Sequence, residues 1–483
     1  MNTIPEQVAA CRQAQREWAG RPVRERLRSV RRFRQSLVAA CDELCAAVER
    51  EIGRSVEETV AADVLPLADA CEFLECEATR LLRPRRVALR RRPLWLWGQR
   101  DSIHRRPHGV VGVIGTWNYP LFLNGGQIAQ ALVAGNGVAW KPSEVSIASA
   151  PLLHSLWLRA GVPPDLLQML PAKREAGAEL IEAEIDHLVF TGSAAVGRKI
   201  AARLGERLIS STLELSGCDA MFVLADADVE MAAKAAFFGF TLNRGQTCIA
   251  VRRAFVQRAI YPAFIEAMQS KLAASGPMTL VMPGQVEQAG RLVQDGQTKG
   301  GRVLAAPGDL RHPTVCVPRV IADATPEMAL CREDCFAPLL AVLPFDTVDD
   351  ALRMDAACRY GLGSSIFTAD FARARSLAPN LRTGSVAVND AVVSTAHPAT
   401  PFGGRGQSGW GVTQGPDGLL AMTVPQVVST RGGKFRPHYE PSGGPGGSVH
   451  RMLQGLLAWN HALAFRQRFR GFWKMVGGAR EMK

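Results

Sequence analysis

The sequence lacks the long apolar runs, signal segments and metal-ligand clusters that mark several classes of protein. No uninterrupted apolar run approaches the roughly 20 residues that a membrane-spanning helix needs, and the opening MNTIPEQVAACRQAQREWAG is not basic and then apolar. The cysteines form no C-x-x-C pair, and neither Cys41/Cys45 nor Cys331/Cys335 has the accompanying histidines of a zinc site. We therefore expect a cytoplasmic protein in a reducing environment, without a structural metal.

The sequence has fewer acidic than basic residues: 45 Asp and Glu against 57 Lys and Arg, which gives a net charge of +12. Such a surface can bind nucleic acid, a membrane surface or an anionic substrate. The excess is mostly arginine, and it gathers in residues 81–93, LLRPRRVALRRRP, and beyond residue 430. No nucleic-acid-binding motif accompanies the charge, so no nucleic-acid partner is expected.

Hydrophobic periodicity predicts an α/β protein, and the length of 483 residues favours more than one domain. From Val23 to about Arg80, apolar residues recur every three or four positions, which predicts packed helices. Strand and helix patterns then alternate, which predicts a parallel sheet with crossover helices. The expected strands are residues 110–114, 137–141, 166–170, 187–190 and 211–215. A second α/β region is expected from about residue 217 to about residue 400.

Three polar positions could form a catalytic set. Cys248 lies between small and polar residues in NRGQTCIA, residues 243–250, where a loop could hold it as a nucleophile. A cysteine is more often a buried small hydrophobe, Glu214 could be a solvated strand end, and Asn118 could belong to a turn. Together, however, a thiol, a carboxylate base and an amide donor for an oxyanion are what aldehyde oxidation through a thiohemiacetal requires.

A cofactor site is predicted at the carboxyl ends of the expected strands. HLVFTGSAAVGRKI reads as a strand, a turn with Gly192, and a helix that Ser193 caps, so free N–H groups could bind a phosphate. Lys141 and Glu144 in WKPSE could both contact ribose hydroxyls, and the carboxylate would repel a 2′-phosphate. NAD is therefore favoured as the cofactor, and NADP stays open.

The motifs WNYP, KPSE, FTGS, LELSG, GQTC, EDCFAP and PFGG occur in this order, and Cys248 follows Glu214 by 248 − 214 = 34 positions. In these motifs the chain resembles the aldehyde dehydrogenase superfamily over about residues 5–430. The resemblance implies that Cys248 is the nucleophile, Glu214 the base and Asn118 the oxyanion residue. The cofactor-binding residues that it implies are Trp117, Lys141, Glu144, Gly192, Ser193, Asp334 and Phe336.

The same resemblance implies two parallel-sheet α/β domains and a small bridging sheet. The implied parts are a NAD-binding domain (1–88 and 108–215), a catalytic domain (216–400), a bridging hairpin and strand (89–107 and 424–433), a return segment (401–423), and a linker with a basic tail (434–483). Trp95 and Trp97 alternate in the bridging region, which suits an exposed hairpin. A homodimer is expected, because a lone hairpin would leave an open sheet edge.

Several residues depart from the family pattern. Ser216 replaces the usual glycine, and Cys218-Asp219 stands where many members carry lysine and a small residue. Arg244 is a bulky cation beside the nucleophile, and it could lower the pKa of the thiol or favour an acidic substrate. Asp334 is one methylene shorter than the family's usual Glu at the contact with the nicotinamide ribose.

The predicted activity is oxidation of an aldehyde to a carboxylic acid, with a thioester hydrolysed by water that Glu214 activates. NDAVVSTAHPATPFGG is most similar to the class 3 branch of the family, which implies a hydrophobic aldehyde, fatty or aromatic. One alternative is a CoA-acylating or thioester-reducing relative, although those branches commonly lack the Glu base. The other is a cofactor-binding scaffold that has lost catalysis.

The segment after the linker PSGGPGG, residues 441–447, reads as a basic amphipathic tail. Apolar residues recur at helical spacing at Met452, Leu456, Trp459 and Leu463, followed by Phe465, Phe469, Phe472, Trp473 and Val476, with Arg466, Arg468, Arg470 and Lys474 between them. Aromatics beside cations are typical of a helix that lies peripherally on an anionic membrane. The same stripe could instead cap the enzyme or its dimer partner, and the sequence leaves both interpretations open.

Overall fold

The computed structural model describes residues 3–93, 96, 98–308, 312–433, 436, 439 and 444–481. The chain divides into two compact units. Unit 1 comprises Met1–Leu82 and Arg106–Val424, and unit 2 comprises Arg83–Arg105 and Pro425–Lys483.

Unit 1 begins with packed helices, as the apolar spacing predicts. They are α1 (Ile4–Gly20), α2 (Val23–Ala39), α3 (Cys41–Ile52), α4 (Val56–Thr59), the π-helical turn η1 (Val60–Val64) and α5 (Leu65–Leu81). Thr3 and Glu6 form a capping box that satisfies N–H groups at the start of α1. Gly53 ends α3 in the left-handed region, with φ of 66°, where glycine has no Cβ penalty.

A six-stranded sheet follows, in the order β19-β7-β6-β3-β4-β5. The strands are β3 (Val110–Ile114), β4 (Gly137–Lys141), β5 (Leu167–Met169), β6 (His187–Gly192), β7 (Ser210–Leu215) and β19 (Gly409–Trp410), and the crossover helices are α6 (Phe122–Ala134), α7 (Ser149–Arg159), α8 (Arg174–Glu182) and α9 (Ala194–Glu206). All pairs are parallel except β19 with β7. The strand order reverses between β3 and β6, and ligands bind at such switch points, at the carboxyl ends of the strands.

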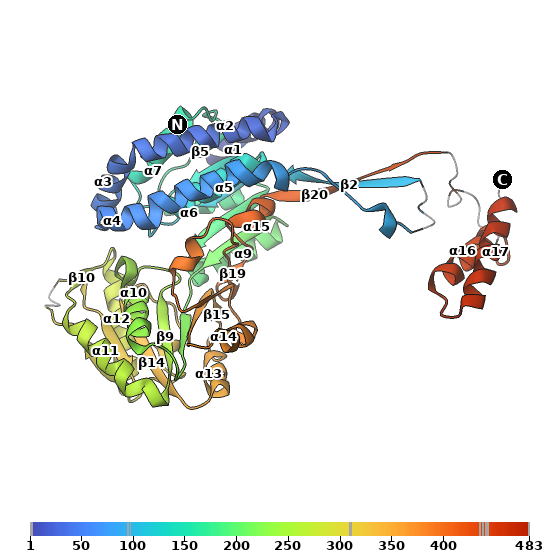
Figure 1. Cartoon of the computed structure of the whole chain (residues 1–483). Coiled ribbons are helices and arrows are strands. Elements are labelled where there is room, and N and C mark those ends of the chain that lie inside the picture. The colour runs from blue at the N-terminus through green and yellow to red at the C-terminus, as the bar shows by residue number, and fades with distance from the viewer. Residues whose placement is uncertain are drawn as a thin grey trace. The chain divides into compact units, whose positions relative to one another are not determined.

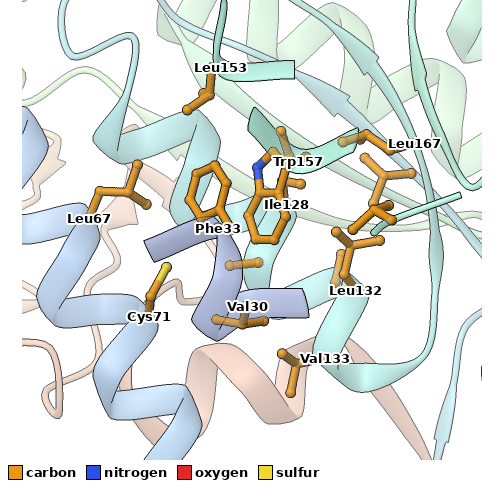
Figure 2. Close-up of a cluster of buried hydrophobic side chains, with 14 of the residues drawn as sticks. Val30, Phe33, Leu67, Cys71, Ile128, Leu132, Val133, Leu153, Trp157 and Leu167 are labelled. Atoms are coloured by element: carbon orange, nitrogen blue, oxygen red, sulfur yellow. The ribbon is translucent and has the colours of Figure 1, made fainter. Parts of the chain in front are cut away.

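The N-terminal helices are held to this sheet by an apolar core. Phe33 of α2 stacks on Trp157 of α7 with ring centroids 3.6 Å apart. Figure 2 shows both rings among side chains from α5, α6 and β5. Because Phe33 and Trp157 are fully buried, truncating either would cost about 3–5 kcal/mol by loss of apolar burial and formation of a cavity. The core therefore fixes the strand ends that carry the site.

A second, seven-stranded sheet has the order β11-β13-β14-β9-β8-β16-β17. Its strands are β8 (Asp219–Val223), β9 (Val251–Gln257), β11 (Arg302–Ala305), β13 (Arg319–Ala322), β14 (Leu339–Phe345), β16 (Gly363–Phe367) and β17 (Ser385–Val388), with helices α10 (Val229–Thr241), α11 (Tyr261–Ala273), α12 (Pro283–Thr298), α13 (Val348–Asp355) and α14 (Phe371–Leu377). Alternate residues of β8 pack on opposite faces, since Phe222 stacks on Phe255 while Met221 joins the other apolar cluster. Figure 1 shows helices on both sides of this sheet. The predicted α/β fold with parallel-sheet domains is confirmed.

Short pairings complete unit 1. The two-residue strands β10 (Met278–Thr279) and β12 (Val315–Cys316) pair, as do β15 (Tyr360–Gly361) and β18 (Arg405–Gly406). Helix α15 (Gly415–Ala421) follows β19.

Unit 2 contains a three-stranded sheet, in the order β1-β2-β20. Its strands are β1 (Arg85–Arg86), β2 (Gln99–Pro107) and β20 (Thr423–Arg431). The last strand lies within a residue or two of the predicted 424–433, but the hairpin predicted for 89–107 begins earlier, because β2 pairs with Arg85–Arg86 and Leu89–Arg91 form a 3-10 turn. Trp95 and Trp97, expected to alternate in this hairpin, lie outside the described residues.

Unit 2 also contains α16 (Ser448–His461) and α17 (Phe465–Glu481), which pack as an antiparallel hairpin (Figure 1). Their backbones touch: a Cβ on Gly455 would lie 2.6 Å from the carbonyl oxygen of Gly471. Met452 and Leu456 are consequently buried against α17. The single interfacial helix of the sequence-based interpretation is instead two helices: α16 ends at His461, and Leu463, expected on the stripe of Met452 and Leu456, lies outside it.

Candidate active site

A strained loop presents Cys248. After α10, Asn243, Arg244 and Gly245 all adopt left-handed φ angles of 48°, 58° and 75°. A side chain at Gly245 would collide with the backbone of Ala337, so only glycine fits there. Strain of this kind persists when surrounding contacts impose it, and it turns the chain so that Cys248 forms part of a cavity wall.

Hydrogen bonds secure this loop on both sides of the strained residues. Gln246 Nε2 donates to the Asn243 carbonyl at 3.1 Å, and Gln246 Oε1 accepts from the Val281 N–H at 2.9 Å. The hydroxyls of Tyr119 and Thr247 lie 2.7 Å apart. The residue before the nucleophile is thereby tied to the WNYP loop, 128 positions earlier in the chain.

Asn118 faces the same loop. It is 2% exposed, and its Nδ2 donates to the Gln246 carbonyl at 3.1 Å, while Thr116 Oγ1 donates to its Oδ1 at 2.7 Å. This second bond fixes which end of the amide points at the nucleophile loop. Because a side-chain amide carries two N–H donors, the other N–H can serve a substrate oxygen beside Cys248. Hydrogen bonds thus fix the orientation of the Asn118 side chain, which a residue that only forms a turn would not need.

Two residues that sequence analysis missed hold Asn118 in place. Arg54 and Asp63 form a fully buried ion pair. Arg54 Nη1 donates to the Asn118 carbonyl at 2.9 Å, and Asp63 Oδ1 accepts from the Phe122 N–H at 2.7 Å, at the start of α6. Removing one partner would leave an uncompensated buried charge. The sequence offered one signal, the charged Asp63 in the otherwise apolar run VAADVLPL, whereas Arg54 lies among other charged residues.

Glu214 lies near the end of β7, opposite Thr191 on one side and Gly409 on the other. Its side chain is buried, so it is not a solvated strand end. Burial raises the pKa of the Glu214 carboxyl well above its ordinary value, and the neighbouring Thr413 hydroxyl offsets part of that rise. A carboxylate whose pKa is raised in this way can act as a general base.

The thiol of Cys248 is neutral in this arrangement. Burial, with further contributions from the Asp219 and Glu214 carboxylates, raises the pKa of Cys248 to about 12. Arg244 does not offset this, because its guanidinium donates to the carbonyls of Ile52 and Gly53 at the end of α3. The sequence-based expectation that Arg244 could lower the pKa of the Cys248 thiol is therefore wrong.

Cys248 opens onto a cavity of about 470 Å³. The apolar side chains around it include Phe122, Leu123, Phe238, Leu242, Val393 and Phe402. Two carboxylates, Glu57 and Glu58, also line it, and the described lining residues include no Lys, Arg or His. The cavity therefore suits an apolar ligand and would repel an anionic one.

The predicted cofactor residues gather at the carboxyl ends of three neighbouring parallel strands. Trp117 follows β3, Lys141 ends β4 and Gly192 ends β6. Ser193 caps α9 by accepting the Val196 N–H at 3.4 Å. The free N–H groups at this helix start can bind a phosphate.

Lys141 and Glu144 form an ion pair in which Nζ and Oε1 are 2.5 Å apart. The lysine is buried, whereas the glutamate side chain is 51% exposed. Burial acts to raise the pKa of Glu144, but the hydrogen bond from Lys141 and other contacts outweigh it, and the net change is downward. Glu144 is therefore a carboxylate at neutral pH, available to ribose hydroxyls.

The two α/β regions also meet around Trp117. Its ring lies 6.1 Å from that of Phe336, centroid to centroid. Nearby, burial and the Asp334 carboxylate raise the pKa of Tyr360, and the Asp334 carbonyl accepts from Gln288 Nε2 at 2.9 Å. The structure thus brings Phe336 to Trp117, and it places the Asp334 carboxylate near enough to Tyr360 to affect its pKa.

Comparisons with known proteins show which family the chain is similar to. The family model described as "Aldehyde dehydrogenase family" matches residues 2–428. A Methylomonas sp protein named 4,4'-diapolycopene aldehyde oxidase is 34% identical over 465 residues, covering 94% of this chain and 86% of its own length. A Mycolicibacterium smegmatis protein, provisionally named a succinate-semialdehyde dehydrogenase that uses NADP(+), is 32% identical and covers 89% of this chain and 86% of its own. A Mycobacterium tuberculosis aldehyde dehydrogenase, solved in complex with NAD+, has a TM-score of 0.81 at 28% identity, covering 87% of this chain and 88% of that one.

Proposed function

Because the chain belongs to the aldehyde dehydrogenase family, we propose that it oxidises an apolar aldehyde to the carboxylic acid through a thioester on Cys248. The observation that carries this proposal is the position of Cys248 in the wall of an apolar cavity, with the buried Glu214 close enough to raise its pKa. A covalent mechanism needs a nucleophile, an oxyanion donor and a base. Cys248, Asn118 and Glu214 supply them.

Each residue has a defined step in this mechanism. The Cys248 thiol gives its proton to solvent, its Sγ bonds to the carbonyl carbon as the C=O π bond opens, and the developing oxyanion receives hydrogen bonds from Asn118 Nδ2 and the Cys248 N–H. When bound, a nicotinamide would supply the acceptor for the hydride, and the carbonyl re-forms as a thioester. Glu214 then takes a proton from water at its carboxylate, the water oxygen bonds to the acyl carbon, and the C–S bond breaks to release the acid. The Cys248 thiolate takes the proton from Glu214, which restores both groups.

The residues at the sheet edge fit NAD(P). The start of α9, with Gly192 and Ser193, offers N–H groups to a pyrophosphate, and Lys141 with Glu144 can bind the adenosine ribose. Trp117 and Phe336 would enclose the nicotinamide end, and Asp334 is proposed for its ribose. In this arrangement residues 1–88 and 108–215 form the NAD-binding domain and residues 216–400 the catalytic domain.

Glu144 should decide between the two nicotinamide cofactors. Replacing Glu144 with Gln removes a carboxylate that repels the 2′-phosphate of NADP, so the NADP/NAD ratio of kcat/KM should rise about tenfold, equivalent to about 1.4 kcal/mol. The ion pair with Lys141 already neutralises part of that repulsion, which limits the expected gain. Steady-state kinetics with both cofactors measure the ratio. Glu266→Gln, the same change at an exposed residue of α11, should leave it unchanged, and an unchanged ratio in Glu144→Gln would contradict the assignment.

An apolar aldehyde fits the cavity better than a charged one. The names of the two relatives point to different substrates, diapolycopene aldehyde and succinate semialdehyde. A semialdehyde with a carboxylate would need a cation nearby, but the described lining carries Glu57 and Glu58 instead. The hydrocarbon walls of Phe122, Phe238 and Phe402 favour a long aliphatic or aromatic chain.

Absorbance of NADH across an aldehyde panel, with and without coenzyme A, tests this function. Long aliphatic and aromatic aldehydes should exceed succinate semialdehyde in kcat/KM by about tenfold or more, since each apolar methylene buried in the cavity contributes about 0.8 kcal/mol. Coenzyme A should make no difference. A requirement for coenzyme A would indicate the acylating alternative, and no NADH from any aldehyde would indicate a cofactor-binding scaffold.

We also propose a homodimer, with the β1-β2-β20 sheet as its bridging element. β20 is the edge strand of this sheet, and Val427 and Val428 on it are 61% and 39% exposed. An apolar edge strand is a template for pairing with another chain. A monomeric mass in sedimentation equilibrium would contradict this proposal.

A further inference from the structure

The α16–α17 hairpin has two chemically different faces. Helical residues follow one another at about 100°. Leu453 and Leu457 come one position after the seam residues Met452 and Leu456, and Trp473 comes one position after Phe472, which contacts Trp459 across the seam. Because the two helices run in opposite directions, a rotation of about 100° past the seam turns the side chains of both helices toward the same face of the pair. The exposed apolar side chains of both helices therefore share one side of the hairpin.

That side is left uncovered within unit 2. Exposed fractions are 52% for Leu453, 64% for Leu457, 51% for Phe469 and 57% for Trp473. Phe469 and Trp473 lie edge to face with ring centroids 6.2 Å apart, so they form one patch. Leu463, in the short link between the helices, is fully exposed at the tip. The opposite face is polar instead, because Lys474 Nζ bridges the helices to Gln454 Oε1 at 2.5 Å.

Cations border the apolar face. Arg466 and Arg470 each follow by one position the aromatics Phe465 and Phe469. Within residues 444–481 there are six Lys and Arg residues and one acidic residue, Glu481. Glu481 is paired with Arg451 across the ends of the hairpin. Long basic side chains beside an apolar strip can reach phosphate groups while the rings enter the hydrocarbon.

We propose that this face of the hairpin docks on the surface of an anionic lipid bilayer. Among the residues that the structure describes, no helix has both the length and the apolar character needed to cross a membrane, so the hairpin would lie on the bilayer. A second copy of the hairpin is a poorer occupant, since two segments of net charge 6 − 1 = +5 repel each other. The hairpin lies beyond residue 428, where the family match ends, so it is an addition to the family's common fold.

Co-sedimentation of the full-length protein with vesicles tests the proposal. Vesicles of phosphatidylserine and phosphatidylcholine should pellet the protein at low salt, and phosphatidylcholine alone should not. Replacing Arg466 and Arg470 with Gln should weaken binding about 30-fold, because each cation near an anionic surface contributes about 1 kcal/mol. Phe469→Ser/Trp473→Ser should also weaken it. The seam residues are intact in both variants, so helix content by circular dichroism should be unchanged.

Matched control variants distinguish the effect of this face of the hairpin from the general effect of removing positive charge or an exposed aromatic residue. Arg24 and Arg28, exposed on α2, changed together to Gln remove the same charge, and Phe371→Ser removes an exposed aromatic on α14. Both controls should sediment like the unchanged protein. Binding that none of the hairpin substitutions weakens, or a protein that never pellets, overturns the proposal. If Phe469→Ser/Trp473→Ser instead changes the mass of the oligomer, the face binds a second copy or caps the enzyme. None of these results depends on which aldehyde the site oxidises.

Discussion

Replacing Cys248 with alanine is expected to abolish aldehyde oxidation while the Kd for NAD stays within about twofold. The thiol forms the only covalent bond to the substrate in the proposed mechanism, and loss of such a nucleophile lowers turnover by about 10⁴-fold or more. The residues proposed for the pyrophosphate and the adenosine ribose lie at the ends of β4 and β6 and at the start of α9, whereas the Cys248 loop follows α10. Alanine removes one sulfur and leaves the hydrogen bonds of Gln246 and Thr247 in place. NADH production and a fluorescence titration with NAD give the two measurements.

Cys76→Ala serves as the matched control, because Cys76 is an exposed cysteine on α5. Its activity should equal that of the unchanged protein. Oxidation that persists in Cys248→Ala would refute a thioester mechanism altogether. A variant that also loses NAD binding would show instead that the loop supports the cofactor site.

Local patterns in the sequence predict the framework of this molecule well. The expected strands 110–114 and 137–141 coincide with β3 and β4, because fully buried parallel strands are short continuous apolar runs. Cys248, Glu214 and Asn118 stand out in the sequence. Each is a polar or reactive residue in an expected loop or strand, and the neighbouring residues give no structural reason for its presence. The structure brings Asn118 within hydrogen-bond reach of the Cys248 loop.

Features that depend on distant pairs were not predictable. Arg54 and Asp63 are nine positions apart, and their roles appear only when α3 and η1 pack beneath the Asn118 loop. The cavity wall combines residues near 57–66 with residues near 392–402. Arg244 precedes the nucleophile closely, yet the left-handed backbone sends its guanidinium to α3. In each case, the distance between two residues along the sequence does not predict whether their side chains are in contact.

Replacing Glu214 with Gln is expected to stall the second half of the reaction and spare the first. The amide has nearly the same volume as the carboxyl, so the packing at the end of β7 should hold, but it cannot take a proton from water. One equivalent of NADH should appear per site in a burst, followed by turnover slower by about 10²-fold or more, which is the usual contribution of a general base. Rapid-mixing absorbance resolves the two phases. Glu57→Gln, the same change in the cavity wall, should not alter the ratio of burst to steady state.

The pH dependence of deacylation gives a second test of the role of Glu214. Burial raises the pKa of Glu214, so its basic form, and with it the rate of deacylation in the unchanged protein, should increase as the pH rises through that raised pKa. Glu214→Gln should lose this increase. Hydroxylamine, which cleaves a thioester without a base, should restore turnover in Glu214→Gln and have no effect on Cys248→Ala. If the burst itself disappears in Glu214→Gln, the carboxylate is needed earlier, to take the proton of the Cys248 thiol whose own pKa is raised to about 12.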